Sequence, residues 1–216
     1  EVGSFESGVS SIRETLFLDV DDLSERNRLM AHEFGQLIHH ENDPFEYIWI
    51  DEGLAGLSEF ISFGGSSELE EEANSWALNT STSLRWWDGR APDVGSSFLF
   101  SAYLADKLGG PAAIRQLVSN PSTGGNGVEN LARNPGPGST PIGTSMSEVF
   151  ANFSAALTLD SAQGAFGFSD IDLVDDCSNG GFCKGSISAE NDQWSEAWQS
   201  SGHSVEGWGR KSFRFT

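Results

Sequence analysis

The chain has 216 residues, of which 38% are hydrophobic, and 32 acidic against 12 basic side chains give it a formal net charge of -20. A chain of this length and hydrophobic content can bury a sizeable core, which predicts one globular domain and not a disordered tail. The negative charge repels nucleic acid, and no apolar run approaches the roughly 18 residues of a membrane-spanning helix. The composition therefore argues against nucleic-acid binding and against membrane insertion.

The ends and the cysteines indicate a location outside the cell. The chain begins at Glu1 with neither a Met nor a basic-then-apolar leader, which fits a processed secreted product as well as an excised piece of a longer chain. Cys177 and Cys183 enclose a short polar loop, which favours a disulfide over free thiols, and a disulfide favours an oxidising compartment. We therefore expect a secreted or cell-surface protein.

The first third of the chain predicts a strand and two helices. Thr15–Val20 has the pattern of a short strand, and polar capping residues after it open a helix that ends at Asp43 and Pro44. An aromatic connector over Phe45–Trp49 leads to a second helix over Glu52–Phe63, which the two glycines after it would close.

The middle of the chain predicts three more helices and a long loop. Glu68–Thr80 has acidic residues at its start and an apolar face, as expected of a covering helix. Ser96–Leu108 and the segment from Pro111 to Val118 predict two buried neighbouring helices. Asn120–Thr144 is rich in Gly, Pro, Ser and Asn, which predicts a mobile surface excursion with one short helix around Val128–Ala132.

The amino-acid composition changes in the last part of the chain. Ser147–Leu159 returns to helical periodicity, whereas Gly, Asp and aromatic residues dominate beyond Asp160 and Val205–Phe215 alternates like a terminal strand. These elements predict a helix-rich α+β fold with short strands near both ends. We expect a helical core over residues 1–160 and a Gly/Asp/aromatic-rich strand-loop region over residues 161–216, packed on the same domain.

The most informative motif lies in the first predicted helix. His32 and Glu33 begin a sequence that differs at one position from the His-Glu-x-x-His helix of zinc proteases, because Gln36 stands where the second His belongs. A zinc peptidase needs three protein ligands and a carboxylate that takes a proton from the attacking water. His32 is a candidate first ligand, Glu33 a candidate general base, and Glu52 a candidate third ligand from the next helix.

This motif and the segment after it resemble the gluzincin zinc metallopeptidases, and within them the secreted hyicolysin-like branch. The matching stretches are Ala31–Phe34 and Trp49–Leu54. Less specific similarity continues through Phe98–Leu104, Leu108–Pro111, Ser147–Phe150 and Gly207–Arg210. The resemblance implies a gluzincin-like catalytic domain in which His32 and Glu52 bind zinc and Glu33 is the catalytic base.

The substitution at Gln36 leaves three interpretations open. Gln36 could bind zinc through its amide oxygen, although a neutral amide is a weaker donor than imidazole. His39 or His40 could substitute if the helix breaks at Gly35, although next to acidic residues they are more typical of a solvated helix end. The site could also be empty, with the His-Glu pair kept as a satisfied buried polar pair, and this is the interpretation that we favour.

A second metal is suggested by an oxygen-rich segment. Its carboxylates and its amide are Asp170, Asp172, Asp175, Asp176 and Asn179. Such spacing can hold calcium, but no twelve-residue calcium loop with its closing Glu is present, which favours a solvated acidic loop.

Three functions follow from these residues. The first is an extracellular protein with a metallopeptidase-like fold and a degenerate zinc site, weak or inactive in peptide hydrolysis. The second is a non-catalytic structural or self-associating surface module. The third is an active zinc endopeptidase that uses Gln36 or a repositioned His to cut a peptide or protein substrate.

Overall fold

Helices make up most of the described chain, which comprises residues 26–161, 163–174 and 180–183 of a computed structural model. Its elements are α1 (Arg26–Asn42), α2 (Ile48–Phe63), α3 (Ser67–Leu78), α4 (Ala91–Leu108), α5 (Pro111–Val118), α6 (Gly125–Arg133), α7 (Met146–Leu159), β1 (Leu173–Val174) and β2 (Phe182–Cys183). This confirms the helix-rich fold, and the two short strands are compatible with the α+β class. The strands predicted over residues 15–20 and 205–215 lie outside the described residues.

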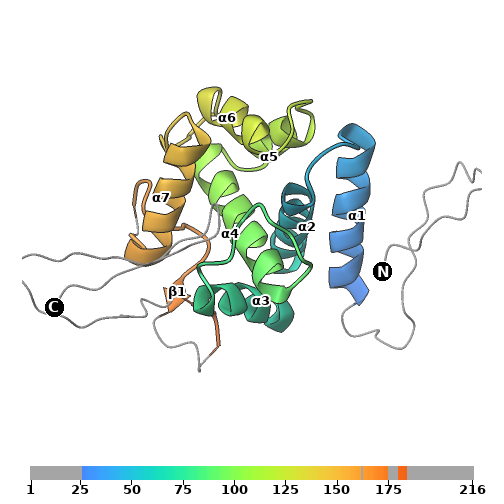
Figure 1. Ribbon diagram of the computed structural model, residues 1–216, viewed down its shortest axis with the longest axis vertical. Helices are drawn as coiled ribbons and strands as arrows, with labels where there is room; N and C mark the ends of the chain where they lie inside the picture. Colours follow the sequence, from blue (N-terminus) through green and yellow to red (C-terminus); the bar gives the residue numbers. More distant parts are fainter. Residues whose placement is uncertain (1–25, 162, 175–179, 184–216) are drawn as a thin grey trace, which may run out of the picture.

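The core surrounds α4, which lies in the middle of the molecule with α2 and α3 beside it and α7 on the side away from α1 (Figure 1). Aromatic side chains fill the space between these helices. The ring centroid of Phe153 in α7 lies 5.8 Å from that of Trp76, 5.2 Å from that of Phe100 and 5.6 Å from that of Tyr103. Such tilted and stacked pairs add specific geometry to the burial of a large apolar area.

The largest differences from the predicted starts are at α2 and α4, which begin four and five residues earlier than their sequence patterns predicted. α2 begins at Ile48, so that Trp49 lies in the helix and is buried instead of belonging to a connector. α4 begins at Ala91 and not at Ser96, and the Asp93 carboxylate fixes this start, because it accepts from the backbone amides of Arg90 at 3.0 Å and Asp88 at 3.2 Å just before the first turn.

The expectation of a mobile surface excursion between α5 and α7 is wrong. Val128, Leu131 and Ile142 in this segment are 0%, 2% and 1% exposed. The backbone is also tied to the end of α4, since the amide of Gly136 donates to the Leu108 carbonyl at 2.7 Å and that of Thr140 to the Lys107 carbonyl at 2.7 Å. Gly and Pro here shape a packed connection around α6, which is longer than the predicted short helix.

The described residues beyond Asp160 pack on the helical core. Phe168, Ile171 and Leu173 are buried, and β1 pairs in parallel with β2. Asn74 of α3 holds β2, because its Nδ2 donates to the Gly181 carbonyl at 2.9 Å and its Oδ1 accepts from the amide of Cys183 at 2.8 Å. The boundary at residue 160 stays a prediction.

Two further expectations concern the cysteines and the membrane. Cys183 is 1% exposed, but Cys177 lies outside the described residues, so the disulfide between them stays a prediction. None of the described helices is at once long enough and apolar enough to cross a membrane.

Candidate metal site between α1 and α2

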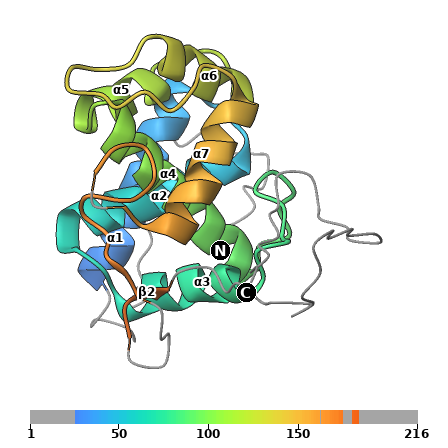
Figure 2. The same ribbon diagram turned by 90° about the vertical axis from the view of Figure 1, so that its left-hand side faces the viewer.

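The motif helix α1 lies on the outer side of α2, and the two helices approach closely (Figures 1 and 2). Gly35 stands at the point of approach, where a Cβ would come within 3.0 Å of the Cβ of Ser58. The Ser58 hydroxyl also donates to the Ala31 carbonyl at 3.0 Å. A small residue at position 35 therefore lets α2 come near enough to present its carboxylates to His32.

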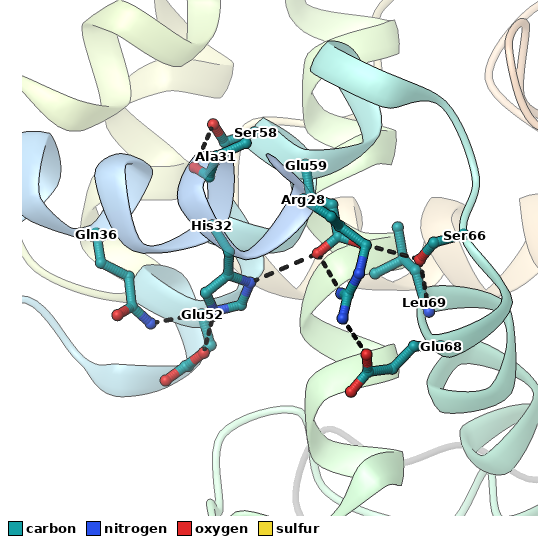
Figure 3. Close-up of polar contacts among 10 residues, drawn as sticks. All are labelled: Arg28, Ala31, His32, Gln36, Glu52, Ser58, Glu59, Ser66, Glu68 and Leu69. Atoms are coloured by element: carbon teal, nitrogen blue, oxygen red, sulfur yellow. Dashed lines mark hydrogen bonds and ion pairs between the residues drawn. The ribbon is translucent and has the colours of Figure 1, made fainter. Parts of the chain in front are cut away.

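The structure brings together the three side chains that the sequence proposed as metal ligands. His32 Nε2 lies 3.3 Å from Glu52 Oε2 and 3.4 Å from the side-chain amide nitrogen of Gln36 (Figure 3). His32 and Gln36 come from successive turns of α1, and Glu52 comes from the second turn of α2. The predicted convergence of an imidazole, an amide and a carboxylate is present.

These two contacts of His32 Nε2 cannot both be good hydrogen bonds. A protonated Nε2 donates to Glu52 but then faces the amide hydrogens of Gln36, whereas an unprotonated Nε2 accepts from Gln36 but then faces a carboxylate. Both distances also exceed the 2.7–2.9 Å that is typical of charge-assisted hydrogen bonds. Rotating the Gln36 amide by 180° turns its oxygen toward His32 Nε2, so that Gln36 then offers an electron-pair donor there.

The spacing of the donors fits a zinc ion, but the donor set is weak. Zinc at about 2.0–2.1 Å from tetrahedral nitrogen and oxygen ligands places those ligands about 3.4 Å apart, close to the two separations around His32. However, Gln36 supplies a neutral amide oxygen, and the described residues contain no group of three His, Cys, Asp or Glu that could hold a metal ion. The distances between the donor atoms therefore suit zinc, whereas the neutral amide of Gln36 is a poor zinc ligand.

A further functional residue, Glu59, was not recognised from the sequence. Its carboxylate is 1% exposed and lies 3.8 Å from His32 Nδ1, on the side of the ring away from Glu52. It accepts hydrogen bonds from Arg28 at 2.8 Å and from the Ser66 hydroxyl at 2.8 Å (Figure 3). Glu59 follows Glu52 by two helical turns and so shares its face of α2, which is the signal that could have identified it.

The buried carboxylate and its partners set the protonation of this site. Burial raises the pKa of Glu59, but the nearby His32 and the hydrogen bonds from Arg28 and Ser66 outweigh it and hold that pKa below its usual range. For His32, burial lowers the pKa, but hydrogen bonds and charges of Glu52 and Glu59 raise it to about 9. In the metal-free protein a proton on His32 therefore balances these carboxylates, and any metal ion has to displace it.

Glu33, the proposed general base, does not share the contacts that join the proposed ligands. Glu33 follows His32 in α1, is half-buried, and forms no hydrogen bond or ion pair with any residue in the described part of the chain. The expectation of a satisfied polar pair between His32 and Glu33 is wrong, because His32 pairs with the carboxylates of Glu52 and Glu59 from α2. Glu33 therefore has no partner among the described residues.

The structure does not support a repositioned histidine. α1 is continuous through Gly35, and His39 turns to Asp51, with its Nδ1 2.8 Å from Asp51 Oδ1. His39 is also 2% exposed, so its assignment to a solvated helix end is wrong, whereas His40 is exposed as expected. Packing of α1 on α2 buries His39, and this cannot be read from the acidic residues next to it in sequence.

The suggested calcium segment is only partly described. Asp170 and Asp172 are exposed, while Asp175, Asp176 and Asn179 lie outside the described residues. The calcium site therefore stays a prediction.

No family model matches the chain, and no curated protein matches it.

Proposed function

We propose that this chain is an extracellular protein with a gluzincin-like metallopeptidase fold and a degenerate zinc site, in which peptide hydrolysis is weak or absent. The observation that carries the proposal is the convergence of His32, Gln36 and Glu52 from α1 and α2 at separations of 3.3 and 3.4 Å around His32 Nε2. The resemblance of the α1 motif to zinc-protease helices supports the same function.

The residues of this chain divide into three roles under the proposal. His32, Glu52 and Gln36 would hold zinc, which as a Lewis acid polarises a peptide carbonyl and activates water. Glu59 is a positioning residue, because a carboxylate on Nδ1 orients the ring and leaves Nε2 free to bind. Glu33 would take the proton of the attacking water. The amide of Gln36 makes zinc binding weak, and activity falls with it.

A second candidate function is a non-catalytic structural or self-associating module. The observation in its favour is the ion network of Arg28, His32, Glu52 and Glu59, which joins α1 to α2 without a metal. A third candidate is an active zinc endopeptidase that uses Gln36 as it stands.

Metal content and proteolysis of the purified chain distinguish these functions. Bound zinc is measured by mass spectrometry and by calorimetric titration, and cleavage of an unfolded protein is followed with zinc, without zinc and with a chelator. The proposal expects substoichiometric zinc and little cleavage. Stoichiometric zinc with chelator-sensitive cleavage would overturn it in favour of the endopeptidase, and no binding at excess zinc would leave the structural module, which sedimentation velocity tests for self-association.

The variant Gln36→His tests whether the missing imidazole is the defect. An imidazole at this position completes a His, His and Glu ligand set, so zinc affinity should rise by at least about tenfold. Gln116→His is the matched control, because it adds an exposed imidazole on α5 away from the site. An equal gain in both variants, or no gain in Gln36→His, would show that α1 and α2 do not hold the ligands as proposed.

A further inference from the structure

A cavity of about 570 Å³ is lined by residues of α1, α2 and α5. Its walls include Gly35, Ile38 and His39 of α1, Leu57 of α2, and Ile114 and Val118 of α5. None of the proposed zinc ligands lines it. Its volume falls in the range of about 300–1,000 Å³ that is usual for small-molecule sites.

The cavity is apolar and open to solvent. Leu54 and Leu57 form its buried floor at 6% and 3% exposure, while Ile38 and Ile61 on its walls are 45% and 59% exposed. Adjacent apolar side chains that remain open to solvent on so acidic a protein are typical of a binding surface.

One polar group in the cavity wall lacks a partner. His39 is 2% exposed, its Nδ1 pairs with Asp51, and its buried Nε2 has no hydrogen-bond partner among the described residues. Buried polar atoms normally have such a partner, so an unsatisfied one in a cavity wall can serve as a contact for a bound molecule. The cavity is therefore lined by apolar side chains together with a buried imidazole that has unused hydrogen-bonding capacity.

The charge at the rim indicates what kind of ligand fits. Arg115 of α5 lines the cavity, is exposed, and forms no ion pair with a described carboxylate, whereas Arg28, Arg90 and Arg133 do. Arg85 also forms no ion pair with a described carboxylate, but Arg115 is the arginine that lines the cavity. It can bind a carboxylate through two parallel hydrogen bonds.

We propose that this cavity binds an amphipathic anion of the aliphatic carboxylate class. The hydrocarbon chain lies on Leu54, Leu57 and Ile114, and the carboxylate pairs with Arg115 at the rim. The buried Nε2 of His39 offers a second polar contact within the same cavity. This binding is independent of the zinc site, so it can be tested in the presence of a chelator.

Calorimetric titration of the full chain with dodecanoate, below its micelle concentration, tests the proposal. Dodecylammonium serves as the probe of opposite charge. We expect saturable binding of dodecanoate and weaker binding of dodecylammonium, although the net negative charge of the protein favours the cation. Arg115→Glu should weaken dodecanoate binding by at least about tenfold, because it replaces a charge-assisted contact with repulsion.

Two controls keep the outcome specific. Arg85→Glu makes the same charge change at an exposed arginine that does not line the cavity and should bind dodecanoate as the unmodified chain does. Val118→Trp fills the cavity from its edge and should abolish binding, whereas Leu159→Trp, on exposed α7 surface, should not. No saturable binding, a preference for dodecylammonium, or equal effects of Arg115→Glu and Arg85→Glu would overturn the proposal.

Discussion

The two faces of α2 are held in different ways. On its inner face α2 packs against α4, in a core of buried apolar and aromatic side chains such as Trp49, Phe98 and Phe100. On its outer face it meets α1, whose only buried residue is a histidine, His39. That second contact depends on the network of Arg28 with the acidic residues of α2 and α3 and on hydrogen bonds across the helices.

Because of this difference, the apolar core stabilises the domain, whereas the polar network positions the helix that carries His32. Apolar burial sets most of the free energy of folding, whereas exposed ion pairs contribute little and buried ones depend on every partner being present. The helix that carries His32 is therefore attached by the interactions that depend most on individual side chains. Changes in the core should unfold the whole domain, and changes in the polar network should release α1 alone.

The largest expected effect comes from the core. Phe153→Ala removes a ring that contacts Trp76, Phe100 and Tyr103, and should lower the free energy of unfolding by about 3 to 5 kcal/mol through lost burial and the cavity left behind. Chemical denaturation followed by circular dichroism measures this change. Amide hydrogen exchange should increase in all helices together, and a loss confined to α7 would contradict the role of Phe153 in a common core.

A smaller and local effect is expected from Glu59→Ala. This change leaves Arg28 and a protonated His32 without their buried carboxylate, which should weaken the docking of α1 by about 2 to 3 kcal/mol, less than for a fully buried pair because Arg28 can turn to solvent. Hydrogen exchange should rise in α1 and stay low in α4. If protection falls equally in both helices, α1 belongs to the same cooperative unit as the core.

Much of the helical framework could be predicted because its boundaries are local. The bounds of α5 follow from the two glycines before Pro111 and from the polar residues after Val118. The sequence pattern placed the start of α4 at Ser96, after Gly95, yet Gly95 lies within the helix, where a Cβ would overlap the carbonyl oxygen of Glu72 in α3. A close approach between helices is a property of tertiary packing and leaves no local pattern.

The same limit applies to the candidate site. The convergence of His32, Gln36 and Glu52 could be predicted from helical spacing and the length of the connector. The burial of His39 against Asp51 could not, because it depends on how α1 is rotated on α2. The role of Glu59 lies between these cases, since its face of α2 was predictable but its partners Arg28 and Ser66 come from two other segments.

The smallest expected effect tests the charge crowding beside this polar contact. Burial, and then the charges of Glu68 and Glu59, raise the pKa of Glu72 in α3 to about 7, while His32 and Arg28 oppose the shift. A carboxyl group whose pKa is higher in the folded state binds more protons there than in the unfolded chain, so its contribution to stability falls as the pH rises from about 4.5 to 7. Glu72→Gln cannot ionise and should be more stable than the unmodified chain above pH 7.

The size and the pH dependence of this gain decide its cause. After allowance for solvent screening, we expect Glu72→Gln to raise the free energy of unfolding by about 1 to 2 kcal/mol at pH 8 and by much less at pH 4.5. Glu71→Gln is the matched control, because it removes the same charge from an exposed position of the same helix. An equal gain in both variants at pH 8 would assign the effect to the net charge of the protein, whereas a gain confined to Glu72→Gln would show that carboxylates crowd where α3 meets the α1–α2 network.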